Sequence, residues 1–189
     1  VADNPGGSLS PREVYESSGL NRLSKEEDFK ILDVKEARVI SGMPIASYFF
    51  EHDKIISLPK MKTHVLTTLT GAVKNMFGAV VGLNKSECHK KLPKPEEFSR
   101  ALVDVFAAVK PHLVLMDGIV AMHGDGPASG KLKDAGLLLA SADSVALDSV
   151  FSTLVGIKPE GIFSTKEAHI KGLGEMDLGK IEILGEKME

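Results

Sequence analysis

Short apolar runs alternate with amphipathic segments of helical length along this chain, and this alternation restricts its fold more than any other feature. Residues 54–58, 112–116 and 135–140 are the apolar runs, each bounded by charged residues, glycine or proline. Residues 95–110 carry apolar side chains at helical spacing, and Asp143 is placed to cap a further helix. This order of elements predicts an α/β fold with a mostly parallel sheet flanked by helices.

Shorter elements are expected towards the two ends of the chain. Residues 30–34 and 37–40 are predicted to form two strands around a tight turn, and Ser10 is a candidate N-cap of an early helix. A last short helix is expected over residues 164–171, followed by a closing strand over residues 181–184.

The length and composition are those of one globular domain. The chain has 189 residues, of which 43% are hydrophobic and 26% are charged. We therefore assign residues 1–189 to a single α/β domain. Because the chain begins at Val1 without a methionine and enters on the loop-forming sequence DNPGG, we expect it to be a fragment of a longer protein.

Several classes of protein are disfavoured by composition. A net charge of -3 with 5% aromatic residues argues against a nucleic-acid partner. The sequence has no apolar run of membrane-spanning length and no signal peptide, so we expect no membrane partner and a cytoplasmic location. A single cysteine, Cys88, excludes a disulfide framework and any iron–sulfur cluster held by four thiolates of this chain alone.

The stretch KMKTHVLTTLTGAVKNMFG, residues 60–78, gathers cationic and polar side chains within an otherwise apolar run. Burying so many donors is costly unless something accepts their hydrogen bonds. We therefore predict that these side chains point into one cavity that holds an anionic small molecule, a metal-bound group or a covalent adduct. The predicted contacts are Lys60, Lys62, His64, Thr70, Lys74 and Asn75. The alternative is a threonine-rich amphipathic helix whose lysines reach solvent.

Three residues in this part of the chain are candidates for chemistry. A desolvated lysine becomes a nucleophilic amine near neutral pH, so Lys74 and the nearby His64 form the predicted catalytic pair. His89 is expected on a polar loop beyond Gly82, where it would close over the site and ligate a metal. The alternatives are a helix-capping His64, a surface Lys74 and a solvated His89. Cys88, beside these cations, is expected to have a lowered thiol pKa.

The lysines also make this segment basic. Residues 54–94 contain eight lysines and a single acidic residue, Glu87, although the whole chain is acidic. A basic segment of this kind suits an anionic ligand. For the lysines around His89, a solvated loop is the alternative.

A second candidate site follows the apolar run that ends at Met116. The sequence DGIVAMHGDGPASG, residues 117–130, is predicted to be a glycine-rich loop. Its Asp117 and Asp125 are candidate ligands of a divalent metal ion. Its backbone N–H groups at Gly124 and Gly126 are candidates for binding an anion. No GK[ST] follows, so this is not a Walker loop, and a nucleotide-binding loop of another kind remains an alternative.

Asp148 is a third candidate. It lies at helical spacing from Val145 and Phe151, on a face of the predicted helix that should be buried. A buried carboxylate needs a partner, and a lysine of residues 60–78 is the predicted one. A ligand-binding role and a purely structural salt bridge are both open.

Three blocks of the sequence resemble successive blocks of the family of domain of unknown function 362 (DUF362). The blocks are LPKMKTHVLTTLTGAVKNMFGAVVG, VLMDGIVAMHGDGPASG and ASADSVALDSVFSTLVG, within a resemblance that runs from about Ile31 to Leu184. Members often carry a fused ferredoxin-like module with CxxCxxC repeats, so the resemblance implies an association with iron–sulfur clusters. With Cys88 alone, this chain does not contain that module. Members also usually have a strand and a helix before the DNP segment, which this chain would lack.

A more distant resemblance concerns the spacing of His64, Lys74 and His89. It is similar to that of the nickel-pincer lactate racemase family, in which a histidine precedes the cofactor-bearing lysine by ten residues and a metal-ligating histidine follows it. Here the second interval is one residue shorter than in that family, and Ala72-Val73 replaces a pair of glycines. The resemblance implies an acid/base role for His64, a covalent or anion-binding role for Lys74 and a metal-ligating role for His89.

Together these features predict an enzyme or redox-associated module that binds an anionic small molecule or a metal cofactor at a lysine–histidine site. The metal would be a divalent or transition metal ion. The alternative function is a non-catalytic binding or scaffold domain that partners a fused or separate ferredoxin-like iron–sulfur module.

Overall fold

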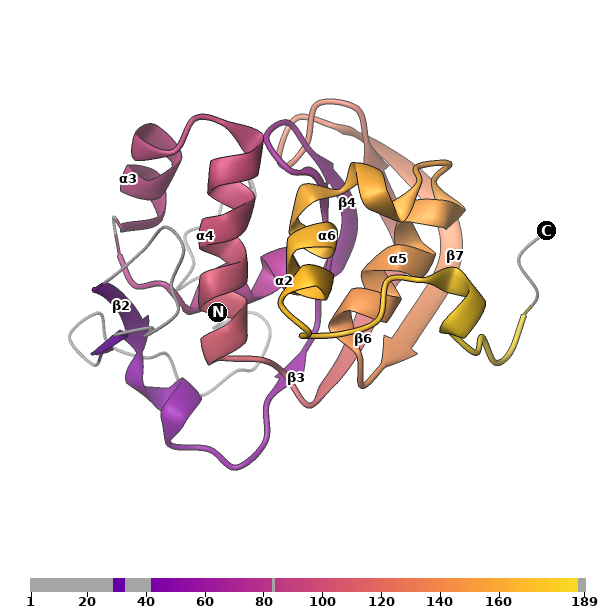
Figure 1. Cartoon of the computed structure of the whole chain (residues 1–189). Helices are drawn as coiled ribbons and strands as arrows, with labels where there is room; N and C mark the ends of the chain where they lie inside the picture. The colour runs from indigo at the N-terminus through magenta and orange to yellow at the C-terminus, as the bar shows by residue number, and fades with distance from the viewer. Residues whose placement is uncertain (1–28, 33–41, 83, 187–189) are drawn as a thin grey trace, which may run out of the picture.

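A five-stranded sheet organises most of the computed structural model, which describes residues 29–32, 42–82 and 84–186 (Figure 1). The strands of this sheet are β3 (Ile56–Ser57), β4 (Lys60–His64), β5 (Thr68–Thr70), β6 (Leu113–His123) and β7 (Lys131–Ser141). A separate two-stranded sheet pairs β1 (Phe29–Leu32) with β2 (Met43–Ala46) in the antiparallel direction.

The long strand β6 is the axis of the larger sheet. β3 and β4 follow one another along one edge of β6 and run parallel to it, whereas β7 pairs antiparallel with its other edge. β5 then pairs antiparallel with β4. The predicted α/β class is confirmed, with parallel pairing at the centre of the sheet and an antiparallel strand on each side.

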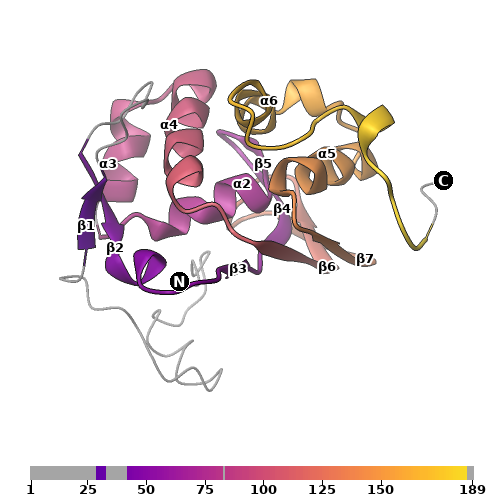
Figure 2. The same ribbon diagram turned by 60° about the horizontal axis from the view of Figure 1, so that its bottom comes forward.

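Helices cover one face of the sheet. The α-helices are α2 (Ala72–Asn75), α3 (Asn84–Lys91), α4 (Pro95–Ala108), α5 (Ser144–Leu154) and α6 (Phe163–Ile170). Short 3-10 helices are η1 (Ser47–Phe50), η2 (Met76–Ala79), η3 (Pro159–Gly161) and η4 (Leu178–Lys180). Figure 2 shows α2, α5 and α6 on the same side of β6 and β7. None of the helices in the described ranges is long and apolar enough to cross a lipid bilayer.

The helices predicted from capping and periodicity are confirmed. Asp143 caps α5, because its Oδ1 accepts hydrogen bonds from the backbone N–H groups of Val145 (2.8 Å) and Ala146 (3.0 Å). α4 begins at Pro95, as the sequence predicts, and α6 spans nearly all of the predicted 164–171 segment.

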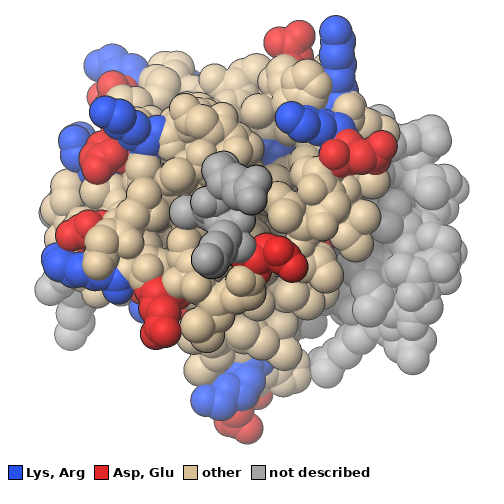
Figure 3. Space-filling model, turned by 90° about the vertical axis from the view of Figure 1, so that its right-hand side faces the viewer, with Lys and Arg blue, Asp and Glu red and all other residues tan. Residues whose placement is uncertain are grey.

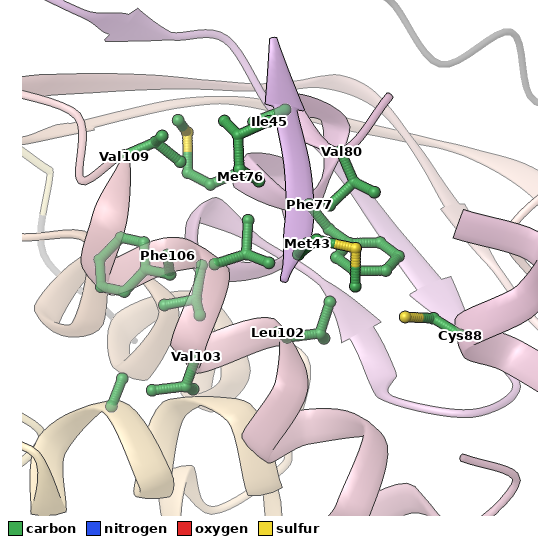
Figure 4. Close-up of a cluster of buried hydrophobic side chains, with 14 of the residues drawn as sticks. Met43, Ile45, Met76, Phe77, Val80, Cys88, Leu102, Val103, Phe106 and Val109 are labelled. Atoms are coloured by element: carbon green, nitrogen blue, oxygen red, sulfur yellow. The ribbon is translucent and has the colours of Figure 1, made fainter. Parts of the chain in front are cut away.

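Two clusters of buried apolar side chains hold the elements together. One cluster joins β2, η2, α3 and α4, with Ile45, Phe77, Leu102 and Phe106 among its members (Figure 4). The other lies between the sheet and α5. Burial of these side chains is the main stabilising contribution, at about 25 cal/mol per Å² of apolar surface.

Two predictions of local structure and one alternative are wrong. Residues 60–70 form the β4–β5 hairpin and the short helix α2 follows, so the alternative of one threonine-rich helix is excluded. Strand β6 continues to His123, through the first half of the predicted glycine-rich loop. Residues 181–184 do not form a strand. The predicted elements at residues 37–40 and after Ser10 lie outside the described residues.

Candidate functional site

The β4–β5 hairpin gathers the polar side chains of the 60–78 stretch. Side chains alternate along a strand, so Lys60, Lys62 and His64 share one side of β4. Thr70 pairs with Lys62 across the hairpin and Thr68 pairs with His64, on that same side. Lys62, His64 and Thr70 are all buried. The hairpin therefore brings a cation, an imidazole and a hydroxyl together out of bulk solvent.

Thr70 is unusual among these groups. Its Oγ1 is fully enclosed and makes no hydrogen bond to any of the residues that the structure describes. A buried hydroxyl without a partner costs free energy, and nearly all buried polar groups in proteins have one. The Thr70 hydroxyl therefore has hydrogen-bonding capacity that the described residues do not use.

Backbone N–H groups of the hairpin turn determine which ring nitrogen of neutral His64 carries the proton. Its Nδ1 accepts hydrogen bonds from the N–H groups of Leu66 (3.1 Å) and Thr67 (3.3 Å). An imidazole nitrogen that accepts a hydrogen bond carries no proton, so the neutral ring carries its proton on Nε2. His64 caps a turn rather than a helix, and its Nε2–H group is a donor.

His89 lies beside His64. The two ring centroids are 6.3 Å apart, with the ring planes inclined at 37°. The Nδ1 of His89 is 2.7 Å from the carbonyl oxygen of Lys85, one turn earlier on α3. Because a carbonyl oxygen only accepts, His89 Nδ1 is the donor, and in the neutral ring Nε2 keeps a lone pair. His89 therefore sits on a helix, not on the predicted loop, and its ring packs 4.4 Å from that of Phe98.

Cys88 directly precedes His89 on α3. Its side chain is buried in the cluster that contains Met43 and Phe77 (Figure 4). Burial raises the thiol pKa above its usual value, and the nearby Lys91 only partly opposes this. The expected lowering of the Cys88 pKa is therefore wrong, because the apolar surroundings dominate over the neighbouring lysines.

Asp148 binds the N-terminus of α2. Its two carboxylate oxygens accept hydrogen bonds from the N–H groups of Ala72 (2.6 Å) and Val73 (3.0 Å). Desolvation raises its pKa to about 7 against the lowering effect of these two bonds. The predicted lysine partner is wrong, since two backbone amides take that place. Gly71 leaves room for this contact, because a Cβ there would overlap the carboxylate.

Lys74 and Asn75 are carried by the short helix that Asp148 caps. Lys74 is half-buried on α2. The side-chain amide of Asn75 donates a 2.9 Å hydrogen bond to the Ser57 hydroxyl and so ties α2 to β3. The carboxylate of Asp148 therefore fixes the backbone that positions Lys74.

Asp117 is hydrogen-bonded to other residues of the protein. Its carboxylate accepts from Lys60 Nζ at 2.7 Å and from the N–H of Ile119 at 3.0 Å. The hydrogen bond from Lys60 is the largest cause of the lowered pKa of Asp117. Lys60 thus neutralises the charge of Asp117 on the neighbouring strand β6, and its own side chain is half-exposed.

The proposed metal ligands do not form a cluster. Asp125 is exposed between β6 and β7, whereas His89 is on α3 and Asp117 lies within β6. Within the described ranges, no three His, Cys, Asp or Glu side chains are grouped so that they could hold a metal ion.

The loop after β6 packs on β4. The Thr63 hydroxyl donates to the Gly124 carbonyl at 2.9 Å, and the Val65 N–H donates to the Gly126 carbonyl at 3.1 Å. A Cβ at Gly126 would overlap the Thr63 carbonyl. The need for glycine at Gly126 therefore has a structural cause, which is the close approach of this loop to β4.

Sequence reasoning did not find two features of this site. The turn amides that orient His64 carry no side-chain signal. The spacing of Lys85 and His89 by one helical turn would have indicated the hydrogen bond that orients His89, once α3 was recognised as a helix.

Comparisons with known proteins give one family and one relative. Residues 1–153 match the family model described as "Domain of unknown function (DUF362)". The chain is also similar to the thylakoid-associated protein sll1697 of Synechocystis sp. (strain ATCC 27184 / PCC 6803 / Kazusa), with 34% identity over 160 residues. This match covers 81% of the chain and 50% of the relative, so the chain spans about half the length of that protein. No solved structure matches the chain.

Proposed function

Given that the chain belongs to the DUF362 family, we propose that it binds an anionic small molecule at His64 and His89 and transfers protons to and from that molecule. The family match covers most of the chain but assigns no activity. The proposal therefore depends on the chemistry of the site itself.

The observation that carries the proposal is the complementary protonation of the two imidazoles. The turn amides hold His64 with a proton on Nε2, and the Lys85 carbonyl holds His89 with a lone pair on Nε2. With ring centroids 6.3 Å apart, one ligand can contact both rings. His89 can then take a proton from the ligand and return it, while the Nε2–H of neutral His64 donates a hydrogen bond to the oxygen on which negative charge develops.

The surroundings of the pair favour an anion. Lys62 lies on the same side of β4 as His64 and is buried, and a buried ammonium attracts negative charge more strongly than an exposed one. Thr70, opposite Lys62, adds a buried hydroxyl. Lys74 on α2 would serve as a further cationic contact.

A metal-bearing cofactor fits the described residues in part. Nε2 of His89 is suited to metal ligation, because its Nδ1–H is held by a carbonyl oxygen in the way that ligating histidines usually are. The described residues supply no group of three ligands, so the cofactor would have to bring the others itself. In that case Lys74 is the residue that we expect to anchor it.

Binding of two probe anions, malonate and phosphate, tests the proposal. We expect His64→Gln to weaken the binding of both anions about tenfold, the effect of losing one hydrogen bond to a charged group. Because Nε2 of neutral His89 only accepts, His89→Gln should weaken the binding of protonated phosphate, which has an O–H donor, more than that of malonate. His52→Gln is the control, because His52 is exposed in the segment between η1 and β3. Isothermal titration calorimetry gives the affinities, and circular dichroism checks that each variant is folded.

Unchanged anion affinity in both variants would remove the proposal. If the variants instead alter only stability or affinity for a ferredoxin, the alternative of a non-catalytic scaffold domain for an iron–sulfur module replaces it. A cytoplasmic location remains part of the proposal, whereas the name of the cyanobacterial relative associates that protein with thylakoids.

A further inference from the structure

One face of the large sheet carries large apolar side chains that no described element covers. They come from three adjacent segments of chain, and they are 41% to 67% exposed. These side chains are Ile56, Leu58, Leu113, Leu115 and Leu138. We call this set the open face.

Strand register shows that these residues lie on one side of the sheet. Ile56 pairs with Leu113, and Leu138 pairs with Asp117, which follows Leu115 by two positions on β6. The residues that alternate with them, Val114 and Met116, are fully buried against the helices. The open face is therefore the side of the sheet opposite α5 and α6.

An open face of this kind is unusual for the pairing of these strands. β3 and β4 run parallel to β6, and parallel strands in proteins are almost always covered on both faces. The sequence of β6 is also typical of a strand covered on both faces, because residues 113–116 are apolar on both sides of the strand. Contiguous exposed apolar surface normally marks an interface.

We propose that the open face is an intramolecular interface of a longer protein, covered by an apolar layer from polypeptide additional to these 189 residues. The cyanobacterial relative supplies the argument for this occupant. The segment matched to this chain is only 50% of that protein, which leaves a stretch of similar length to pack on it. A helical layer would complete the three-layer arrangement that parallel strands usually have.

The charges on this face are compatible with such a layer. The ion pair of Lys60 and Asp117 lies beside the open face, with its two charges cancelling and its side chains already bonded to each other at 2.7 Å. Figure 3 shows the side of the molecule where β7 lies, with charged side chains of both signs scattered over a largely uncharged surface. Lys62 lies on the same side of β4 as Lys60, so the added layer would also border the candidate site. The open face would need this layer whatever the candidate site binds.

Cysteine accessibility tests the proposal on intact proteins. Leu115→Cys and Leu138→Cys are made singly in this chain, with Cys88→Ala to remove the native thiol. The aligned positions are changed in the full-length Synechocystis protein, in a background without other cysteines. Lys158→Cys, at an exposed position before η3, and its aligned position are the controls. Reaction rates with a maleimide are measured, and sedimentation velocity gives the mass.

We expect the two open-face cysteines to react as fast as the Lys158→Cys control in this chain. In the full-length relative we expect them to react about a hundredfold more slowly than its control, as for a site exposed only by local opening. Equal rates at all three positions in the full-length relative would overturn the proposal. Protection already present in this chain would also overturn it, and a dimeric mass would then identify a second copy as the occupant.

Discussion

The imidazole of His64, at the end of strand β4, lies 6.3 Å from the imidazole of His89 on helix α3, measured between ring centroids. Each ring is held by the backbone at Nδ1, His64 as an acceptor and His89 as a donor. Two neighbouring histidines from different elements thus have, in their neutral forms, Nε2 atoms of opposite hydrogen-bonding character.

The hydroxyl of Thr70 is predicted to serve binding rather than folding. Because Oγ1 of Thr70 has no described partner, Thr70→Val should leave the free energy of unfolding unchanged or raise it, while weakening malonate binding. Thr67→Val is the matched control. The Thr67 hydroxyl donates to the Leu69 carbonyl at 3.0 Å, so its loss should cost about 1 kcal/mol. Urea denaturation would contradict this account if Thr70→Val were the more damaging change.

Stability should depend on pH through Asp148. Its pKa is raised to about 7 in the folded protein from an ordinary value of 3.8. Its contribution to stability is therefore fully present below about pH 4 and is lost as the pH rises to 7, where the buried group must ionise. The full loss is roughly 3–5 kcal/mol.

Asp148→Asn tests this dependence, because asparagine does not ionise. The free energy of unfolding of the native protein minus that of the variant should fall between pH 4 and 7 and then become constant. Urea denaturation at a series of pH values gives this difference, in which other titrating groups cancel. A difference that does not change with pH would show that Asp148 does not titrate in this range.

Gly71 is predicted to be indispensable at its position. Gly71→Ala places a methyl group on the Asp148 carboxylate, which must then move off the N–H groups of Ala72 and Val73. We expect a loss of about 1–3 kcal/mol in the free energy of unfolding. Gly161→Ala is the control, because its Cβ would make only an ordinary 3.7 Å contact. Equal thermal stability of the two variants would refute the prediction.

The ion pair of Asp104 and Lys171 is predicted to stabilise the packing of α4 on α6. Asp104 is 1% exposed, so Lys171→Met would take the ammonium of Lys171 away from a buried carboxylate. The expected cost is about 3–5 kcal/mol. Lys91→Met breaks the exposed pair with Glu87 on α3 and should cost less than about 1 kcal/mol. Chemical denaturation of both variants compares the two pairs directly.

The helices were predictable because their signals are local. Asp143 is followed by an apolar helical pattern, and Pro95 marks a helix start, so α5 and α4 could be located from a few neighbouring residues. The hairpin of β4 and β5 could not be located in this way. Its threonines fit a strand or a helix equally well, and pairing of β4 with the distant β6 decides between them.

The residues of the candidate site could be predicted from the sequence, but the hydrogen-bond partners of those residues could not. Lysine and histidine in an apolar run mark a site because their burial is costly, and Lys62 and His64 are indeed buried. The partners of Asp148 and His64 are backbone N–H groups, which every residue has, so no sequence pattern distinguishes them.

The protonation of the two imidazoles is the most direct test of this account. Two-bond ¹H–¹⁵N correlation spectra of the ¹⁵N-labelled protein at neutral to mildly alkaline pH distinguish the two tautomers, and His64→Gln and His89→Gln assign the signals. We predict that His64 carries its proton on Nε2 and that His89 carries its proton on Nδ1. The same tautomer on both rings would contradict the assignment of one donor and one acceptor.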